Sequence, residues 1–577
     1  MTQRLPALSL LLIAPAIAPA IARAQTAPWA EYANKDGANL QVGGHLANST
    51  DMSVTGRHVA FVTTASLTAN DVNGTYNGYV RDLSAQTTRL VGEVGGVAPG
   101  GDTQWVSLSG GGRFVAFGTS ASNLGAPDAN GAHDIYVHDL VNDSVSRASF
   151  ALGGADPNGV CGWPDISDDG RRVVYRSSAT NISAAATAGY DQIYLFDAQS
   201  GATTLVSKDA NGVAGTWFCY GQPRISADGR YVVFTSGANN LLATDTNLGL
   251  DVFRYDVATG ALVLASSLPS GAATPLTNNA SPDVSANGRY VAFDTLAPLL
   301  PSDLNFQTDV YVKDMLTGAL TLITATPTNV AGTGWQPRIS ADSRHVVFLS
   351  DSTLLDPLKT TNSLEVFIRD LPTATTQRLS TSPVGADANS VCGEPCVSGN
   401  GRRAAFISAA TNIVLPDLAP GYYDVIARDR GAPSAPIVYC VPKVNSLGCT
   451  PLLNHSGTPS ASLASGFVMS VTNLLNNKYG TMFYSLGGAN NLPFSGGYLC
   501  VQAPLLRTPV TLTGGTVGGN DCTGVMTRDF NAWIASGADP ALAAGVEVWA
   551  QFYSRDPGFA PPNNVNLTEA LDFVIHN

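Results

Sequence analysis

A motif that ends in Gly-Arg, or in one copy Ser-Arg, and precedes an apolar run recurs seven times between Gly56 and Arg402. In its fullest form it reads Ser-x-Asp/Asn-Gly-Arg. The copies carry the pairs Gly56-Arg57, Gly112-Arg113, Gly170-Arg171, Gly229-Arg230, Gly288-Arg289, Ser343-Arg344 and Gly401-Arg402. A spacing of this regularity predicts a repeat fold in which each copy is one supersecondary unit.

Each copy reads as four antiparallel strands. In the fourth copy, Pro223–Ser226 forms the first strand, Tyr231–Phe234 the second, Asp251–Asp256 the third and Ala261–Ala265 the fourth. The Asp228-Gly229 pair between the first two strands predicts a tight hairpin in which both residues have positive φ. Four-stranded units that repeat around an axis form a propeller. We therefore predict an all-β fold with a seven-bladed β-propeller over residues 25–431.

The last copy lacks its outermost strand, because the chain turns into a Pro-rich connector after Asp429. Residues 29–34 have the sequence Trp-Ala-Glu-Tyr-Ala-Asn and stand before the first copy, as an outermost strand stands before the other copies. We expect this N-terminal strand to complete the seventh blade and close the ring.

The repeat, exemplified by Pro223-Arg-Ile-Ser226 followed by Ala227-Asp-Gly229, resembles that of the TolB-like β-propellers. The resemblance spans roughly residues 40–430 and implies the fold. The same repeat serves binding proteins, peptidase gating domains and some lyases, so it does not by itself imply a function.

Residues 1–24 combine Arg4, an apolar run and a small-residue cleavage site before Gln25, which predicts a signal peptide. The mature chain is expected to be secreted or periplasmic, without a transmembrane anchor. Its net charge of −13 disfavours nucleic acid as a partner, since nucleic-acid binding requires a basic surface.

The repeat stops before a linker at 432–442, and residues 443–577 have a different pattern. Strand-like segments separated by Gly-rich turns predict a small β-sandwich-like domain, with one short helix near 529–535. The segments 439–449, 457–462 and 554–564 are similar to a terminal module of secreted multidomain bacterial proteins. This similarity implies surface display, attachment or ligand binding.

The chain has eight cysteines, and in an exported protein they favour disulfides over metal binding. Eight cysteines allow 105 connectivities, so the sequence alone does not settle the pairing. The positions in the repeat and in the tail suggest the pairs Cys161–Cys219, Cys392–Cys396, Cys440–Cys449 and Cys500–Cys522.

The pattern Asp-x-Asn-x-x-x-Asp precedes the third strand of three copies. It comprises Asp128, Asn130 and Asp134; Asp245, Asn247 and Asp251; and Asp303, Asn305 and Asp309. Oxygen ligands at alternate loop positions suit Ca²⁺. The other interpretation is that these side chains form Asx turns that hold the loop.

Four tryptophans lie just ahead of innermost strands, namely Trp105, Trp163, Trp217 and Trp335. We expect them to gather at one mouth of the central channel, where they would stack on sugars or bind a peptide. The alternative is that each tryptophan packs between two blades.

No sequence pattern marks a catalytic site. Of the seven histidines, His58, His138 and His345 occupy positions that other residue types fill in other copies, and none has a paired-ligand spacing. The chain also lacks the Gly-x-Ser-x-Gly motif of the α/β-hydrolases. The sequence favours an exported, non-catalytic binding or scaffold protein with a protein or glycan partner. The alternative is a secreted polysaccharide lyase with its site at the channel mouth.

Overall fold

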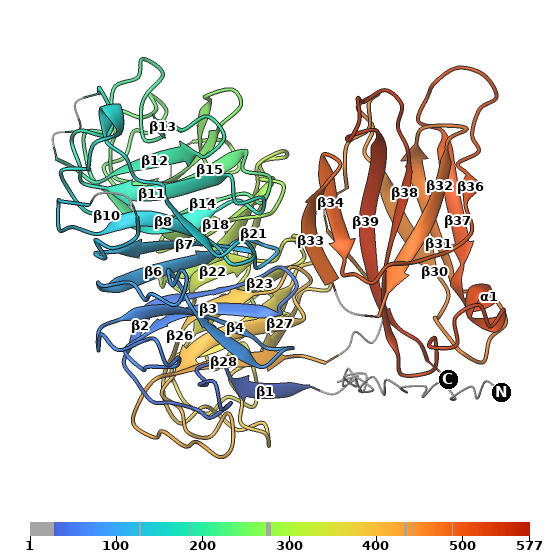
Figure 1. The fold of residues 1–577 in the computed structure, drawn as a ribbon, viewed down its shortest axis with the longest axis horizontal. Coiled ribbons are helices and arrows are strands. Elements are labelled where there is room, and N and C mark those ends of the chain that lie inside the picture. The colour runs from blue at the N-terminus through green and yellow to red at the C-terminus, as the bar shows by residue number, and fades with distance from the viewer. Residues whose placement is uncertain are drawn as a thin grey trace, which may run out of the picture.

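The computed structural model describes residues 28–576 except 126–127, 186, 188, 273–278, 432–435, 441 and 487–488. The predicted signal peptide and part of the predicted linker lie outside these residues. Over the described ranges the chain is all-β, and its strands form seven four-stranded antiparallel sheets followed by the smaller sheets of the tail (Figure 1). A multi-bladed propeller is therefore confirmed.

Six sheets consist of consecutive strands, and we number them blades 1 to 6. Their strands are β2 (Leu46–Met52), β3 (His58–Thr63), β4 (Asn77–Asp82), β5 (Thr87–Leu90); β6 (Thr103–Leu108), β7 (Phe114–Thr119), β8 (Asp134–Asp139), β9 (Ser144–Arg147); β10 (Cys161–Ile166), β11 (Arg172–Ser177), β12 (Gln192–Asp197), β13 (Ala202–Leu205); β14 (Cys219–Ile225), β15 (Tyr231–Ser236), β16 (Asp251–Asp256), β17 (Leu262–Leu264); β18 (Asn279–Val284), β19 (Tyr290–Thr295), β20 (Asp309–Asp314), β21 (Leu320–Leu322); and β22 (Trp335–Ile339), β23 (His345–Ser350), β24 (Glu365–Asp370), β25 (Thr375–Arg378). A short 3₁₀ helix, η1 (Leu152–Gly154), follows blade 2.

Blade 7 combines the two ends of the propeller. Its strands are β26 (Cys392–Val397), β27 (Arg403–Ser408), β28 (Asp424–Asp429) and β1 (Trp29–Tyr32). β1 pairs antiparallel with β28, from Trp29 opposite Asp429 to Tyr32 opposite Ile426. The innermost strands of successive blades contact one another around the axis, and β26 contacts β2 again. The ring is thus closed through the N-terminal strand.

The repeated motif builds the hairpin of each blade. In blade 4 the hydroxyl of Ser226 accepts a hydrogen bond from the Tyr231 amide at 2.9 Å and donates one to Asp228 at 2.5 Å. Arg230 forms an ion pair with Asp256, at the end of the third strand, at 2.9 Å. The recurring spacing of the motif therefore reflects contacts within one blade.

The expected two-residue hairpin was wrong. Of Asp228 and Gly229 only the glycine has positive φ, at 71°. The Gly229 amide donates to the Ser226 carbonyl at 2.8 Å, and the Ser226 amide donates to the Tyr231 carbonyl at 2.8 Å. The loop is therefore a longer one, with a β-turn followed by a left-handed glycine.

Aromatic pairs between the second and third strands supply much of the core. In blade 4, Phe234 lies opposite Phe253 and their ring centroids are 5.6 Å apart. Blades 1, 2, 3, 5 and 6 have an aromatic pair in the same place. These cross-strand pairs stabilise each sheet and fill the space between neighbouring blades.

The tail contains two packed sheets and a hairpin. Its elements are β29 (Ile437–Tyr439), β30 (Leu452–Ser456), β31 (Val468–Leu474), β32 (Tyr479–Ser485), β33 (Ala489–Phe494), β34 (Gly497–Val501), β35 (Leu506–Arg507), β36 (Thr511–Leu512), β37 (Gly524–Asp529), α1 (Phe530–Ala535), β38 (Glu547–Arg555) and β39 (Val565–Val574). One sheet contains β29, β39, β38, β32, β35 and β36, the second contains β30, β31 and β37, and β33 pairs with β34.

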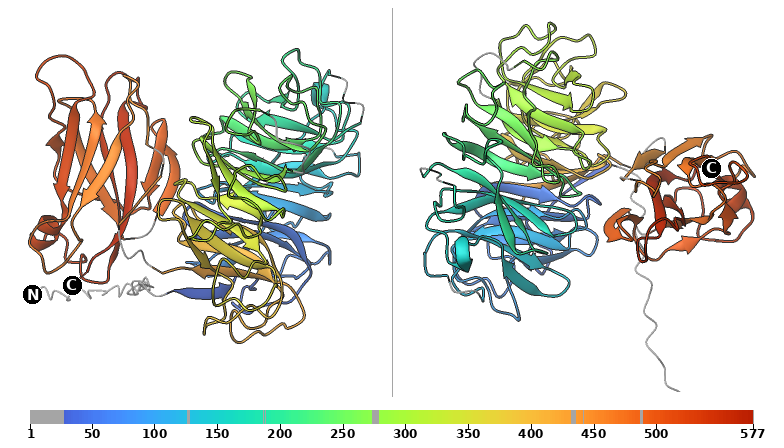
Figure 2. Two further views of the ribbon diagram at one scale, coloured as in Figure 1. Left: turned by 180° about the vertical axis from the view of Figure 1, so that it is seen from behind. Right: turned by 90° about the horizontal axis from the view of Figure 1, so that it is seen from above.

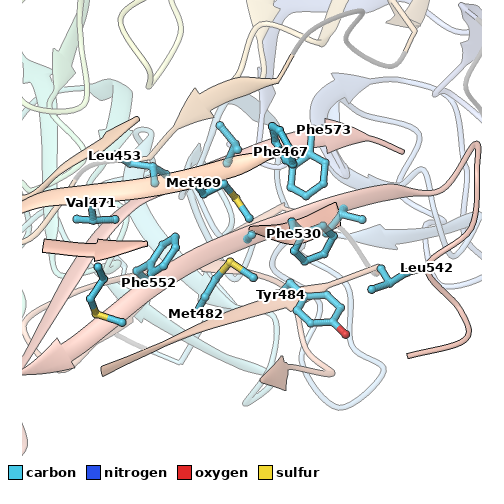
Figure 3. Close-up of a cluster of buried hydrophobic side chains, with 14 of the residues drawn as sticks. Leu453, Phe467, Met469, Val471, Met482, Tyr484, Phe530, Leu542, Phe552 and Phe573 are labelled. Atoms are coloured by element: carbon cyan, nitrogen blue, oxygen red, sulfur yellow. The ribbon is translucent and has the colours of Figure 1, made fainter. Parts of the chain in front are cut away.

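The two sheets of the tail enclose one hydrophobic core, as expected for a β-sandwich-like domain. Met469 of the smaller sheet packs with Met482 and Phe573 of the larger one, and Phe530 of α1 joins them (Figure 3). The predicted helix is confirmed, and the Asp529 carboxylate caps it by accepting a hydrogen bond from the Ala532 amide.

Within the part of the chain that the structure describes, no helix is long and apolar enough to cross a membrane.

Candidate functional site

The two ends of the propeller channel differ because the tail is docked at one of them. The Tyr498 hydroxyl donates to the carbonyl of Ala227, in the hairpin turn of blade 4, at 3.1 Å. Asn400, in the hairpin turn of blade 7, donates to Asp572 at 3.1 Å, and next to it Arg402 forms an ion pair with Glu547. Figure 2 shows the tail beside the propeller from two further directions. We call the docked end the hairpin end and the opposite end the loop end.

Inside the channel, a belt of paired side chains links the innermost strands. Arg338 lies 2.9 Å from Asp51 and 3.6 Å from Asp283, and Arg224 lies 3.5 Å from Asp165. The three aspartates also accept hydrogen bonds from backbone amides of neighbouring blades at 2.7–2.8 Å. These charged groups therefore hold blades together, both adjacent blades and, through Arg338 and Asp51, blades 6 and 1 on either side of blade 7.

At the loop end, β-bulges in the innermost strands place side chains around the channel mouth. Trp163, Ser281, Gln336 and Glu394 have positive φ of 51°, 46°, 50° and 46°. Each lies within a register shift of its strand. A bulge re-aims a side chain, and non-glycine residues with positive φ are costly and concentrate at functional sites. Sequence reasoning missed this set, although a proline directly follows each of the four residues.

The four tryptophans do not form one ring. Trp105 and Trp163 pack together with their centroids 4.4 Å apart. The Arg176 guanidinium lies 3.4 Å from the Trp163 ring centroid and forms an ion pair with Asp191 at 3.2 Å. Both indole rings are half-buried between blades 2 and 3.

Trp217 belongs to a second aromatic cluster, which we call the blade 4 patch. It contains Tyr190, Trp217, Phe218 and Tyr220, with the Tyr190 and Phe218 centroids 4.8 Å apart. The exposed fractions of Trp217, Phe218 and Tyr220 are 48%, 37% and 39%. Trp335 instead packs against the core between blades 6 and 7, so for this residue the packing interpretation holds.

A pocket of about 460 Å³ adjoins the blade 4 patch. Its lining residues are Thr216, Trp217, Tyr220, Gly237, Asn239, Leu248, Gly249 and Leu250. None of these side chains carries a charge, and Trp217 and Tyr220 offer aromatic faces beside the polar groups of Thr216 and Asn239. The pocket thus combines stacking surfaces with neutral hydrogen-bonding groups, as small-molecule and glycan sites do.

The predicted calcium loop of blade 2 is neutralised by an arginine. Arg147 forms an ion pair with Asp134 at 2.6 Å, and Asn130 also donates to Asp134 at 2.9 Å. At the expected calcium site of Asp128, Asn130 and Asp134, the Arg147 guanidinium thus already supplies a positive charge next to Asp134.

The equivalent loops of blades 4 and 5 have no such arginine. Asn247 donates to Asp251 at 2.7 Å, and the Tyr311 hydroxyl donates to Asp303 at 2.6 Å. Burial, with the nearby Asp251, raises the pKa of Asp245 to about 6, and burial raises that of Asp309 to about 7. Over the described residues no group of three or more His, Cys, Asp and Glu side chains is placed to hold a metal.

The expected disulfide pairing was wrong in every pair. The structure contains Cys440–Cys500 and Cys449–Cys522, with Cα atoms 6.2 and 6.4 Å apart. β34, which carries Cys500, lies against β39, the strand that pairs with β29 just ahead of Cys440, whereas Cys449 and Cys522 lie in the loops before β30 and β37.

The four propeller cysteines are buried free thiols. Cys161 donates instead to Ser177 within its own blade at 3.2 Å, and burial raises the pKa of this thiol to about 12. Cys219 lies in the next blade, across the packed inter-blade core. Cys392 and Cys396 both lie on β26, where four residues of extended chain separate them by roughly 13 Å, beyond the reach of a disulfide.

Neither the scan against family models nor the search of curated proteins found a match. Among solved structures, the chain is similar to TolB from Agrobacterium tumefaciens, with 16% identity and a TM-score of 0.32 over 52% of this chain and 87% of that one. It is also similar to a prolyl endopeptidase, with 13% identity and a TM-score of 0.41 over 74% of this chain and 54% of that one. A third similar structure is the Dos1 propeller, with 11% identity and a TM-score of 0.37 over 71% of this chain and 97% of that one.

Proposed function

We propose that this protein is an exported, non-catalytic binding protein, and that the loop end of the propeller binds a neutral glycan at the blade 4 patch. The exposed Trp217 beside an uncharged polar pocket is the observation that carries the proposal. Pyranose rings stack their C–H faces on indole and phenol rings, and their hydroxyls bond to amide and hydroxyl groups such as those of Asn239 and Thr216.

The two disulfides of the tail support export, because disulfides persist in oxidising compartments. Docking of the tail at the hairpin end supports separate roles for the tail and for the loop end of the propeller. The tail would attach or display the propeller, while the loop end faces the ligand.

A glycan array with the wild type and Trp217→Ala tests the proposal. We expect loss of Trp217 to weaken glycan binding about 10- to 30-fold, the range for a central aromatic contact worth roughly 1.5–2 kcal/mol. Tyr479→Ala is the matched control, since Tyr479 is an aromatic residue of the tail that is 63% exposed. Equal binding by Trp217→Ala and the wild type would refute the site.

The same preparation should be assayed for unsaturated uronate products. A polysaccharide lyase must bind an anionic uronate, and an uncharged pocket does not favour that substrate. Release of such products by the wild type would replace the binding proposal with the lyase alternative. Capture of a protein in place of any glycan would assign the patch to a protein partner.

A further inference from the structure

The loops between the second and third strands of blades 1, 2, 4 and 5 share one turn. An asparagine in each loop accepts a hydrogen bond from the backbone amide two residues later, at 2.6–3.0 Å. The residue directly after this asparagine is, in the four blades, Gly74, Gly131, Leu248 and Phe306. It occupies the same position of the turn in every case.

Phe306 takes a backbone conformation that glycine takes in blades 1 and 2. Its φ is 55°, close to the 69° of Gly74 and the 65° of Gly131. A bulky L-residue rarely adopts this left-handed conformation, because its Cβ lies too close to the following carbonyl oxygen. Phenylalanine at this position is therefore strained, and strain of this kind concentrates at functional sites.

Packing of the Phe306 ring does not offset the strain. The exposed fraction of Phe306 is 76%, and a Cβ added at Gly74 or Gly131 would meet no atom within 4 Å. The Asn305 side chain donates to the Gly332 carbonyl, which ties the turn to the connection between blades 5 and 6. An exposed ring on a fixed turn suits ligand binding, because an aromatic side chain has only two torsions to restrict.

The residues on either side of Phe306 line a second pocket, of about 280 Å³. These residues are Asn305 and Gln307. Asp351 is the one charged residue among the described residues that line this pocket, and it accepts a hydrogen bond from the Thr333 hydroxyl. Gln307 and Asn362 are exposed and offer amide groups to a ligand. The second pocket therefore repeats the chemistry of the pocket beside Trp217, with an aromatic ring next to neutral polar groups.

The blade 4 loop and the blade 5 loop connect the two pockets. These blades are neighbours in the ring, and Leu248 of the blade 4 loop lines the first pocket. Leu248 and Leu304 are 78% and 73% exposed. The charged residues of loops 237–250 and 296–308 are Asp245 and Asp303, which are 7% and 3% exposed. The two loops thus present apolar side chains and almost no charge to solvent.

We propose that Phe306 and the pocket beside it form a second subsite for the glycan, so that the ligand is an extended neutral oligosaccharide. This inference rests on the proposed function and adds the length of the ligand to it. One sugar ring stacks on Trp217 and another on Phe306, where its hydroxyls bond to Gln307 and Asn362. Because the two sugars belong to one molecule, the affinity rises with the length of the chain.

Titration calorimetry with neutral oligosaccharides tests the proposal. The probes are gluco-, manno-, xylo- and galacto-oligosaccharides from disaccharide to octasaccharide. In the series that the wild type binds, we expect the octasaccharide to bind about tenfold more tightly than the disaccharide. Phe306→Gly should abolish this gain. Phe306→Tyr keeps the ring and should retain the gain, as should the matched control Tyr423→Ala, which removes a 44% exposed aromatic residue of the blade 7 loop.

Thermal melting separates loss of binding from loss of folding. Glycine adopts a left-handed φ without strain, so Phe306→Gly should melt at the wild-type temperature or slightly above it. A clearly lower melting temperature would show that the ring serves stability and would overturn the proposal.

Two binding results would also overturn the second subsite, namely equal affinity of the wild type for short and long chains, or an unchanged length dependence in Phe306→Gly. Either result leaves the site at Trp217 standing if Trp217→Ala still weakens binding. Failure of the wild type to bind any of the series would instead reject the glycan proposal, and this inference with it.

Discussion

Closure of the ring by the N-terminal strand gives the sharpest stability prediction. Tyr32 of β1 is 3% exposed, packs in the core between blades 6 and 7, and donates its hydroxyl to the Val414 carbonyl at 2.9 Å. Replacing Tyr32 with alanine removes nearly the whole buried ring from the strand that joins the first and last parts of the propeller.

The expected loss follows from the burial of this residue. Truncating a fully buried large aromatic residue to alanine costs about 3–5 kcal/mol. The unfolding entropy of a propeller of roughly 400 residues is about 0.8 kcal/mol per kelvin, so the melting temperature should fall by about 4–6 °C. Tyr32→Phe removes only the hydrogen bond to Val414, worth about 1 kcal/mol, and should lower it by about 1 °C.

Differential scanning calorimetry of the wild type and both variants measures these shifts. The transition that contains the propeller should move in Tyr32→Ala and stay nearly in place in Tyr32→Phe. If the two variants melt together, or if Tyr32→Ala melts with the wild type, then β1 does not stabilise the ring and the closure argument fails.

Two further predictions concern buried charges of the propeller. Arg338→Met leaves Asp51 without its cation and leaves Asp283 with only Arg224, at 4.0 Å. We expect a loss of about 3–5 kcal/mol in stability, measured by thermal melting, whereas equal melting would show that the belt is not structural. Asp168 has a pKa raised to about 7, chiefly by burial. An acid whose folded pKa lies above its unfolded value loses stability as pH rises from about 4 to about 7, so Asp168→Asn should flatten this decline and raise the melting temperature at pH 8. A wild-type melting temperature that is constant over this pH range would contradict that assignment.

Much of the propeller could be predicted because its diagnostic contacts are local. Arg230 and Asp256 pair within one blade, and the Ser226 hydroxyl binds an amide five residues away. The residues that make such contacts recur at the same positions in each repeat, so the pattern is visible in the sequence. The arginine that closes the blade 2 loop also lies near in sequence, 13 residues after Asp134. Comparing the last residue of the fourth strand among the copies would have shown that blade 2 has an arginine where blades 4 and 5 have a leucine.

The candidate site was harder to predict because it depends on contacts between distant residues. Trp105 and Trp163 meet because two blades are adjacent, while Trp335 occupies a similar place in the repeat and is packed into a core. The disulfides join residues 60 and 73 positions apart, through the particular way in which the tail folds back. No rule based on sequence spacing predicts these tryptophan contacts or disulfides.

The sequence by itself determined the repeat, the four strands of each copy and the use of the N-terminal strand, since each follows from alternating local chemistry. The tertiary structure decided which aromatic residues are exposed, which cysteines pair and which carboxylates meet an arginine. It also decided which end of the channel the tail covers, through contacts such as that of Tyr498 with Ala227, 271 residues apart. The physical reason is that burial and charge compensation depend on all neighbours in space, and most of those neighbours are remote along the chain.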